Sequence, residues 1–161
     1  MHANTRRVAE VAAAAGLDLD VHTFPAGTRT AADAAAAIGC DLAAIAKSIV
    51  LTADDGAVVV LTSGAHRVDY TKVARALGVA TVRRADAEEA RAATGYPIGG
   101  TAPWGYPQPV PVLCDPHLLT YDVVWAAGGT PDTVFPITPD ELLRIAGART
   151  ADVAEDPSAP A

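Results

Sequence analysis

Residues 47–63 read KSIVLTADDGAVVVLTS, two apolar runs separated by Asp54-Asp55-Gly56. The runs KSIVLT (residues 47–52) and AVVVLTS (residues 57–63) have the length and the β-branched composition of strands. Asp-Gly is favoured in the tight turns of β-hairpins, because glycine adopts a positive φ at no steric cost. The stretch therefore predicts an antiparallel hairpin, and this pairing decides the fold class.

Helix and strand signals follow one another irregularly in the rest of the chain. Helices are predicted at residues 5–15, 30–39, 69–77, 86–94 and 138–147, with Thr30, Asp69, Asp86 and Thr138 as N-caps. Further strands are predicted at residues 17–24, 79–84, 110–114, 121–127 and 133–137. Hairpin-linked strands with irregular helices favour one mixed α/β (α+β) domain over a doubly wound βαβ sheet. The domain is assigned to residues 1–150, and the polar residues 151–161 are predicted to be a disordered tail.

The composition is that of one globular domain. Of the 161 residues 50% are apolar but only 5% are aromatic, so the core should consist of Ala, Val, Leu and Ile. The net charge of −7 argues against an extended nucleic-acid platform but allows a local basic patch. The N-terminus lacks the apolar core of a signal peptide and no run approaches about 18 apolar residues, which predicts a cytoplasmic protein without a membrane span. Cys40 and Cys114 are expected to be reduced and buried.

The most irregular backbone is predicted at residues 94–105, TGYPIGGTAPWG. The stretch is no dinucleotide fingerprint, because no G-x-G-x-x-G follows a strand and opens a helix, and it lacks the Gly-Lys-Ser/Thr of a P-loop. Adjacent Gly99 and Gly100 permit a tight turn, and they also allow main-chain amides to approach a ligand closely. Pro97 and Pro103 stiffen the flanks. A structural turn and a ligand-binding loop are equally compatible with this pattern.

Other side chains also leave alternatives open. Lys47 at the start of its strand is either a surface lysine with its stem against the core or a site residue. His22 is more typical of a structural histidine than of a catalytic one. Cys114-x-x-His117 offers two ligands where a structural zinc ion needs four, so no metal site is predicted. A cluster of basic residues either contacts phosphates or forms an ordinary solvated surface. These basic residues are Arg67, Lys72, Arg75, Arg83 and Arg84.

Four segments carry a family resemblance when they are taken together. They are AIAKSIVL (residues 44–51), VDYTKVARALGV (residues 68–79), TGYPIGGTAPWG (residues 94–105) and AAGGTP (residues 126–131). In this order they resemble the YbaK/ProX family, the aminoacyl-tRNA deacylases related to the editing domain of bacterial prolyl-tRNA synthetase. The resemblance covers about residues 8–146. It implies a barrel-like, mainly antiparallel sheet with surrounding helices, and hydrolysis of the ester between a wrong small amino acid and tRNA, usually tRNA(Pro).

The resemblance also implies a set of site residues. Lys47 takes the position of the family's active-site lysine, and Gly99 and Gly100 fall on loop glycines whose amides hold the substrate. Thr101 and Ala102 are expected to influence which amino acid fits. The other predicted substrate-binding residues are His22, Phe24, Pro103, Gly128 and Gly129.

The sequence departs from the family pattern close to the predicted pocket. Ala102 stands where many members have a serine directly before the proline. Ala127 replaces a small hydroxyl residue of the cysteine-specific branch, and Thr130-Pro131-Asp132 replaces a basic residue and a glycine of that branch. Cysteine is therefore not assigned as the amino acid that is removed.

The implied hydrolysis requires few catalytic groups. An aminoacyl ester is already activated, so position and charge stabilisation suffice for attack by water. Lys47 is expected to engage the terminal adenosine through its side chain and the α-amine through its carbonyl, without cofactor or metal ion. The implied partners are the acceptor end of aminoacyl-tRNA and, because an acidic protein should bind tRNA weakly, prolyl-tRNA synthetase or elongation factor. The alternatives are a catalytically inert tRNA- or synthetase-binding module and a hydrolase of another small ester.

Overall fold

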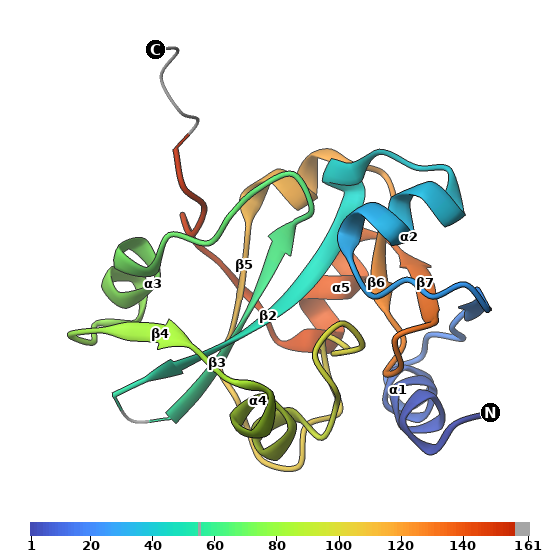
Figure 1. Ribbon diagram of the computed structural model, residues 1–161, viewed down its shortest axis with the longest axis horizontal. Coiled ribbons are helices and arrows are strands. Elements are labelled where there is room, and N and C mark those ends of the chain that lie inside the picture. Colours follow the sequence, from blue (N-terminus) through green and yellow to red (C-terminus); the bar gives the residue numbers. More distant parts are fainter. Residues whose placement is uncertain (55, 157–161) are drawn as a thin grey trace.

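The computed structural model describes residues 1–54 and 56–156 (Figure 1). The helices are α1 (Ala3–Ala14), α2 (Ala31–Ile38), α3 (Tyr70–Leu77), α4 (Ala87–Thr94) and α5 (Pro139–Ala146), with short 3-10 helices η1 (Leu42–Ala44) and η2 (Pro116–Thr120). The strands are β1 (His22–Thr23), β2 (Ile45–Ala53), β3 (Gly56–Ser63), β4 (Val82–Arg84), β5 (Val112–Cys114), β6 (Val124–Ala127), β7 (Thr133–Ile137) and β8 (Arg149–Thr150).

The strands form one sheet in the order β1-β7-β6-β2-β3-β5-β8, and β4 also pairs with β2. The pairs β1–β7, β6–β7, β2–β3 and β2–β4 are antiparallel, whereas β2–β6, β3–β5 and β5–β8 are parallel. The predicted mixed α/β domain with a mainly antiparallel sheet is therefore confirmed.

The predicted hairpin is the longest pairing of the sheet. β2 and β3 pair from Ala46 opposite Ser63 to Ala53 opposite Gly56. Gly56 pairs with Ala53 as the first residue of β3 and has φ +139°, and Asp55 lies outside the described residues. The predicted antiparallel pairing of the two apolar runs is therefore confirmed.

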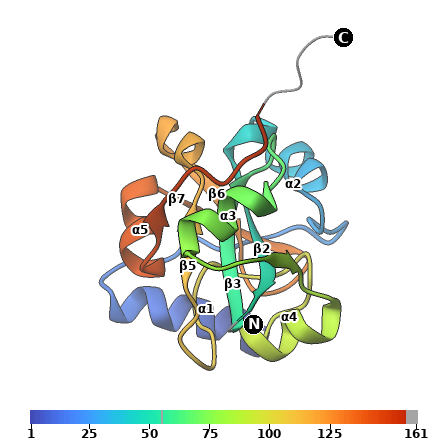
Figure 2. The ribbon, with the colours of Figure 1, turned by 90° about the vertical axis from the view of Figure 1, so that its left-hand side faces the viewer.

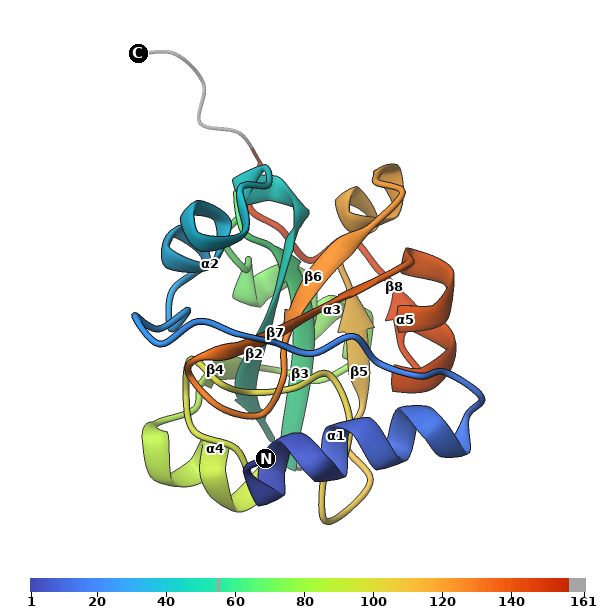
Figure 3. The same ribbon diagram turned by 90° about the vertical axis from the view of Figure 1, so that its right-hand side faces the viewer.

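Burial on both faces explains the unbroken apolar run of β3. Val59 and Leu61 pack into the main core cluster together with side chains of α1, α4 and α5. Val58 and Val60 face the other way and pack against Val73 of α3, which lies across this face of the sheet (Figure 2). α2 packs against the sheet near β6 and β7. In the view of Figure 3, α1 lies below the strands and α5 lies to their right.

The predicted helix caps are confirmed. Thr30, Asp69, Asp86 and Thr138 each accept a hydrogen bond from a main-chain N–H in the first turn of the helix that follows. The glycines that end α2, α3 and α5 adopt the left-handed conformation, and they are Gly39, Gly78 and Gly147. None of the helices in residues 1–54 and 56–156 is long and apolar enough to cross a lipid bilayer.

The strand predicted at residues 17–24 is wrong for most of its length. Only His22 and Thr23 pair, with β7, although Leu17, Leu19 and Val21 do pack against the main core. An extended segment that buries one face shows the same period of two as a strand, so the pattern alone does not reveal whether a partner strand is present.

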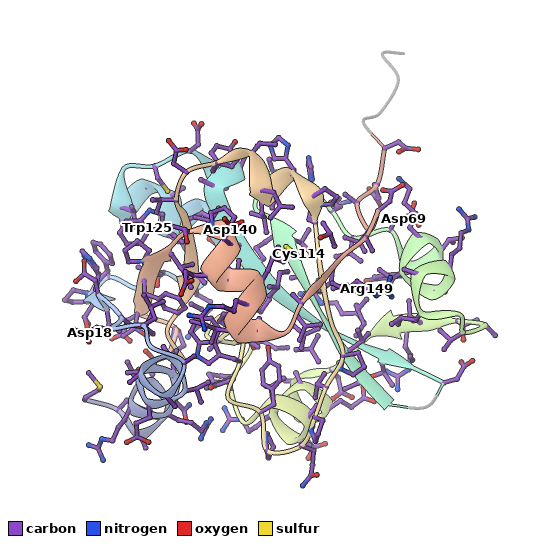
Figure 4. The ribbon with its side chains drawn as sticks, turned by 180° about the vertical axis from the view of Figure 1, so that it is seen from behind. Asp18, Asp69, Cys114, Trp125, Asp140 and Arg149 are labelled. Atoms are coloured by element: carbon purple, nitrogen blue, oxygen red, sulfur yellow. The ribbon has the colours of Figure 1, made fainter. Side chains whose placement is uncertain are left out.

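The boundary predicted after residue 150 is too early. Val153 is fully buried beside α3, its carbonyl accepts a hydrogen bond from Asp69 N–H at 2.8 Å, and Ala154 bridges to Val68. Figure 4 shows the segment that follows Arg149 passing close to Asp69. The first residues of the predicted tail thus pack against the domain, and residues 157–161 lie outside the described part of the chain.

Candidate functional site

The candidate site lies where one edge of β2 has no neighbouring strand among the described residues. β3 pairs with β2 along one edge, whereas the other edge is shared by two strands. β6 pairs there with Ile45 and Ala46, and β4 pairs there from Leu51 to Ala53. β6 and β4 diverge between these points, and a cleft of about 370 Å³ borders residues 47–50. This volume is at the lower end of the range for small-ligand sites.

Together with β2, four segments from distant parts of the sequence form the cleft wall. Besides residues 45–50 of β2, they are residues 28–31 with Ala34, residues 84–85 with Ala90, the loop residues Ile98, Gly99 and Thr101, and Trp125–Ala127 with Val134. Seven of the side chains are alanine methyl groups, so the walls are apolar but leave space. These alanines are Ala31, Ala34, Ala46, Ala85, Ala90, Ala126 and Ala127.

Lys47 is half-buried in this wall. Its Nζ donates a hydrogen bond to the main-chain carbonyl of His66 at 2.8 Å. Burial lowers the pKa of Lys47, the nearby cations Arg84 and Arg67 lower it further, and Asp115 opposes the shift. The Lys47 ammonium group thus lies near two other cations and is hydrogen-bonded to one neutral carbonyl. This positive environment suits an anionic group of a ligand.

A buried carboxylate fixes the segment that holds Lys47. Asp115 is 2% exposed and accepts hydrogen bonds from the main-chain N–H groups of Ser63 and His117. Its Oδ2 also lies 2.7 Å from Nδ1 of His66. Sequence analysis missed this pair, because His66 and Asp115 are 49 residues apart and meet only through the parallel pairing of β3 with β5. The one available signal was Asp115-Pro116 as the start of a helical turn.

Gly99 and Gly100 permit the tight turn and the close packing of the loop. Gly100 donates its N–H to Pro97 carbonyl at 3.0 Å, and Gly99 has φ +86°. A Cβ on Gly99 would lie 2.5 Å from Arg29 Cγ, and one on Gly100 would lie 2.7 Å from the carbonyl carbon of Thr130. Both glycines are therefore required by the turn itself, whereas their role in ligand binding stays a prediction. Gly99 additionally lines the cleft, whereas Gly100 is buried and its N–H is already used.

The three residues after the glycines differ in accessibility. Thr101 lines the cleft, and its hydroxyl donates to Pro97 carbonyl at 3.1 Å. Ala102 is fully buried in the main core, and Pro103 is buried beside it. Ala102 and Pro103 therefore do not line the cleft, because the chain turns inward after Thr101, and their contact with a substrate stays a prediction.

The predicted far wall is formed by neighbours of the predicted glycines. Gly128 is buried and donates its N–H to Thr133 carbonyl at 2.9 Å, which closes the β6–β7 hairpin. Gly129 is also buried, and its carbonyl accepts from Asn4 Nδ2 at 3.1 Å. These glycines therefore hold the hairpin, and Trp125–Ala127 supply the cleft wall.

His22 and Phe24 support this wall from behind. The His22 ring meets Trp125 edge-to-face at 5.2 Å and stacks on Phe24 at 6.5 Å, and Nε2 of His22 lies 2.9 Å from Asp20. Phe24 packs against the cluster around Ala34. Neither residue lines the cleft, and this position fits a structural role for His22, which contacts the cleft residue Trp125.

The basic cluster separates into paired and unpaired residues. Lys72 contacts Asp152 and Asp156, and Arg83 binds Glu89 with both terminal nitrogens, which lowers the pKa of Glu89 to about 2. Arg84 and Arg67 are exposed and make no side-chain hydrogen bond or ion pair among the described residues. Arg84 lines the cleft. The part of the chain that the structure describes contains no group of three or more His, Cys, Asp or Glu side chains that could hold a metal ion.

Comparison with known proteins now decides the family. Residues 25–145 match the sequence profile of the aminoacyl-tRNA editing domain. The chain belongs to this family. A solved structure described as a candidate trans-editing enzyme for prolyl-tRNA synthetase superposes with a TM-score of 0.90 at 43% identity, over 97% of this chain and 99% of that one. The structure of hypothetical protein APE2540 gives 0.86 at 32% identity, over 92% and 99%.

Two curated relatives place the editing domain in different contexts. Protein YwhH of Bacillus subtilis, described as uncharacterized, is 29% identical over 117 residues, which are 71% of this chain and 74% of that protein. Proline–tRNA ligase of Levilactobacillus brevis is 34% identical over 76 residues, which are 47% of this chain and only 13% of the ligase. The editing domain described here thus resembles one part of a much longer ligase.

Proposed function

We propose that this editing domain is a free-standing trans-editing enzyme that hydrolyses the ester between a small, wrongly attached amino acid and tRNA(Pro). The observation that carries the proposal is the convergence of Lys47, Arg84 and Gly99 on one small cleft with alanine-rich walls. A larger, more open groove of about 1180 Å³ lies beyond Arg29 and Gly129. The smaller cleft is preferred because Lys47 and the unpaired edge of β2 border it.

The size of the cleft supports a small amino acid. A synthetase pocket built for one amino acid rejects a smaller one by only about 1–3 kcal/mol, so a second site that admits only small residues increases accuracy. The alanine-lined cleft of about 370 Å³ suits such a second sieve.

The positive charge of the cleft is consistent with a leaving group that is a nucleotide, the terminal adenosine of tRNA. Lys47 and Arg84 are adjacent cations, and cations of this kind bind backbone phosphates. The net charge of −7 opposes an extended phosphate-binding surface, which favours recognition of the acceptor end and delivery of the tRNA by the synthetase or elongation factor.

The proposed reaction is attack of water on the ester carbonyl. The carbon–oxygen bond to the ribose breaks, the water proton passes to the departing ribose oxygen through solvent, and free amino acid and tRNA leave. Main-chain amides beside the cleft stabilise the developing oxyanion, and Lys47 holds the nucleotide. No step requires a cofactor.

The first prediction tests the function itself. Purified protein is incubated with tRNA(Pro) that carries Ala, Ser, Cys, Thr or Pro, and the released amino acid is measured. At least one small amino acid should be released about tenfold faster than Pro, because the second sieve must spare the correct product. Binding of these tRNAs without release of any amino acid would instead indicate an inert binding module.

The second prediction separates two adjacent arginines. Arg84→Ala should weaken binding of uncharged tRNA and reduce the slope of log affinity against log salt concentration by about 1, because one phosphate contact is lost. Arg83→Ala is the matched control, since Glu89 already neutralises this side chain. Fluorescence titrations between low and moderate salt give both slopes, and equal slopes for the two variants would contradict the assignment.

A further inference from the structure

We infer that the open edge of β2 at Ser48 receives the aminoacyl group as if it were one residue of an antiparallel strand. This inference deepens the proposed function, because it assigns the group that recognises the amino acid. It replaces the expected main-chain role of Lys47, whose carbonyl faces β3, as the hydrogen bonds of β2 indicate.

Two hydrogen bonds fix the direction of every main-chain group in β2. Gly64 N–H donates to Ile45 carbonyl on the β3 side, and Ala85 N–H donates to Val50 carbonyl on the β4 side. Successive residues of a strand point their main-chain groups to opposite edges. The N–H and carbonyl of Lys47 therefore face β3, and those of Ser48 face the opposite edge.

That edge has no strand partner at Ser48 in the described part of the chain. The pairing with β6 ends at Ala46, and the pairing with β4 begins at Leu51. Ser48 also lines the cleft, so its N–H and carbonyl border the space where a ligand would lie. An unpaired strand edge is a template for another extended segment.

An aminoacyl group has the geometry of such a segment. In an antiparallel hydrogen-bonded pair, two residues exchange both of their N–H···O bonds. The α-ammonium group of the substrate would donate to Ser48 carbonyl, and the ester carbonyl oxygen would accept from Ser48 N–H. The second bond also aligns a donor with the oxyanion that forms when water attacks.

The same pairing places the amino-acid side chain. Side chains of directly opposed residues lie on the same face of a sheet, so the substrate side chain would lie beside that of Ser48. This face of β2 also carries Ala46 and Val50. With Ala85, Ala90 and Ala126, these residues belong both to the cleft wall and to the main core, and little space remains for a large side chain.

The hydroxyl of Ser48 independently indicates that a polar group of a ligand binds beside it. Its Oγ is buried and has no hydrogen-bond partner among the described residues. Burial of an unpaired hydroxyl is unfavourable, and a rotation about one bond would direct it to a neighbouring ligand. A substrate hydroxyl or thiol beside it would satisfy it, which favours Ser, Thr or Cys over Ala.

Nuclear magnetic resonance tests the main-chain contact without relying on activity. The probe is 3′-deoxy-3′-(L-alanylamino)adenosine, whose amide linkage resists hydrolysis. Saturating probe should slow solvent exchange of the Ser48 amide about tenfold or more, since a hydrogen-bonded amide is shielded from water. Slowing at Gly99 with no change at Ser48 would overturn the inference. The result stands by itself even if the protein hydrolyses none of the charged tRNAs.

Substitution tests the hydroxyl. Ser48→Ala should lower kcat/KM for Ser-tRNA(Pro) about fivefold relative to Ala-tRNA(Pro), because one neutral hydrogen bond is lost. The variant should be no less stable than the wild type, since the hydroxyl has no partner to lose. Thr52→Ala, on the same face of β2 but outside the cleft, is the matched control and should leave this ratio unchanged. An unchanged ratio in Ser48→Ala would contradict the side-chain placement.

Discussion

Replacement of Lys47 by Ala is expected to lower kcat/KM for deacylation about 100-fold, because loss of the contact that holds the nucleotide displaces the ester from its reactive position. Among the residues that the structure describes, Lys47 alone combines a position in the cleft wall with a charge partly withdrawn from water. Lys47→Arg should recover part of the activity, because it keeps the charge but changes the shape of the donor. Single-turnover release of labelled amino acid measures each effect, and wild-type rates in Lys47→Ala would remove Lys47 from the mechanism.

Loss of folding is a competing explanation, and the pKa of Lys47 argues against it. Its pKa in the folded protein lies below the ordinary 10.5, so the unfolded chain binds more protons between the lowered value and 10.5. Stability therefore rises with pH through that window, and at neutral pH the folded protein bears the full cost of the charge. Lys47→Met should consequently be no less stable than the wild type at pH 7 in a denaturant titration, while its activity is lost.

Local chemistry made much of the fold predictable. The Asp-Gly signal located the central hairpin, and each polar cap lies at the start of the helix that it predicted. β8 could not be predicted, because Arg149 and Thr150 are exposed and carry no burial pattern. The order of the strands was also inaccessible, since it depends on pairings such as that of β3 with β5.

The site was predictable at the level of segments rather than atoms. The family resemblance indicated correctly which loops meet around Lys47, but it could not distinguish a cleft wall from the layer behind it. Ala102 and Gly128 lie in that second layer, whereas Trp125 and Ser48 lie in the first. No role could be predicted for Ser48, because its environment arises where β6 and β4 diverge, and no local sequence pattern marks the end of a strand pairing.

The largest expected effect on stability comes from the base of the cleft loop. Trp104→Ala should lower the free energy of unfolding by about 3–5 kcal/mol, the usual cost of removing a buried large aromatic side chain. Trp104 is 3% exposed, packs 5.3 Å from Phe135 between ring centroids, and donates its indole N–H to Val8 carbonyl at 2.9 Å. Its own carbonyl accepts from the fully buried Tyr96 hydroxyl at 2.7 Å. Two aromatic residues thus fasten both ends of the loop that presents Gly99.

The same substitution at Trp125 separates stability from recognition. Trp125 is only partly buried on β6 and lines the cleft, so Trp125→Ala should cost much less stability than Trp104→Ala but should raise KM more at matched folded concentration. Urea titrations compare the two free energies, and deacylation assays at low temperature compare the kinetics of the folded fractions. If Trp104→Ala left the free energy of unfolding within about 1 kcal/mol of the wild type, the irregular loop would not be anchored in the core. The position of Gly99 at the cleft would then depend only on the turn between Pro97 and Gly100 and on the contact of Gly99 with Arg29.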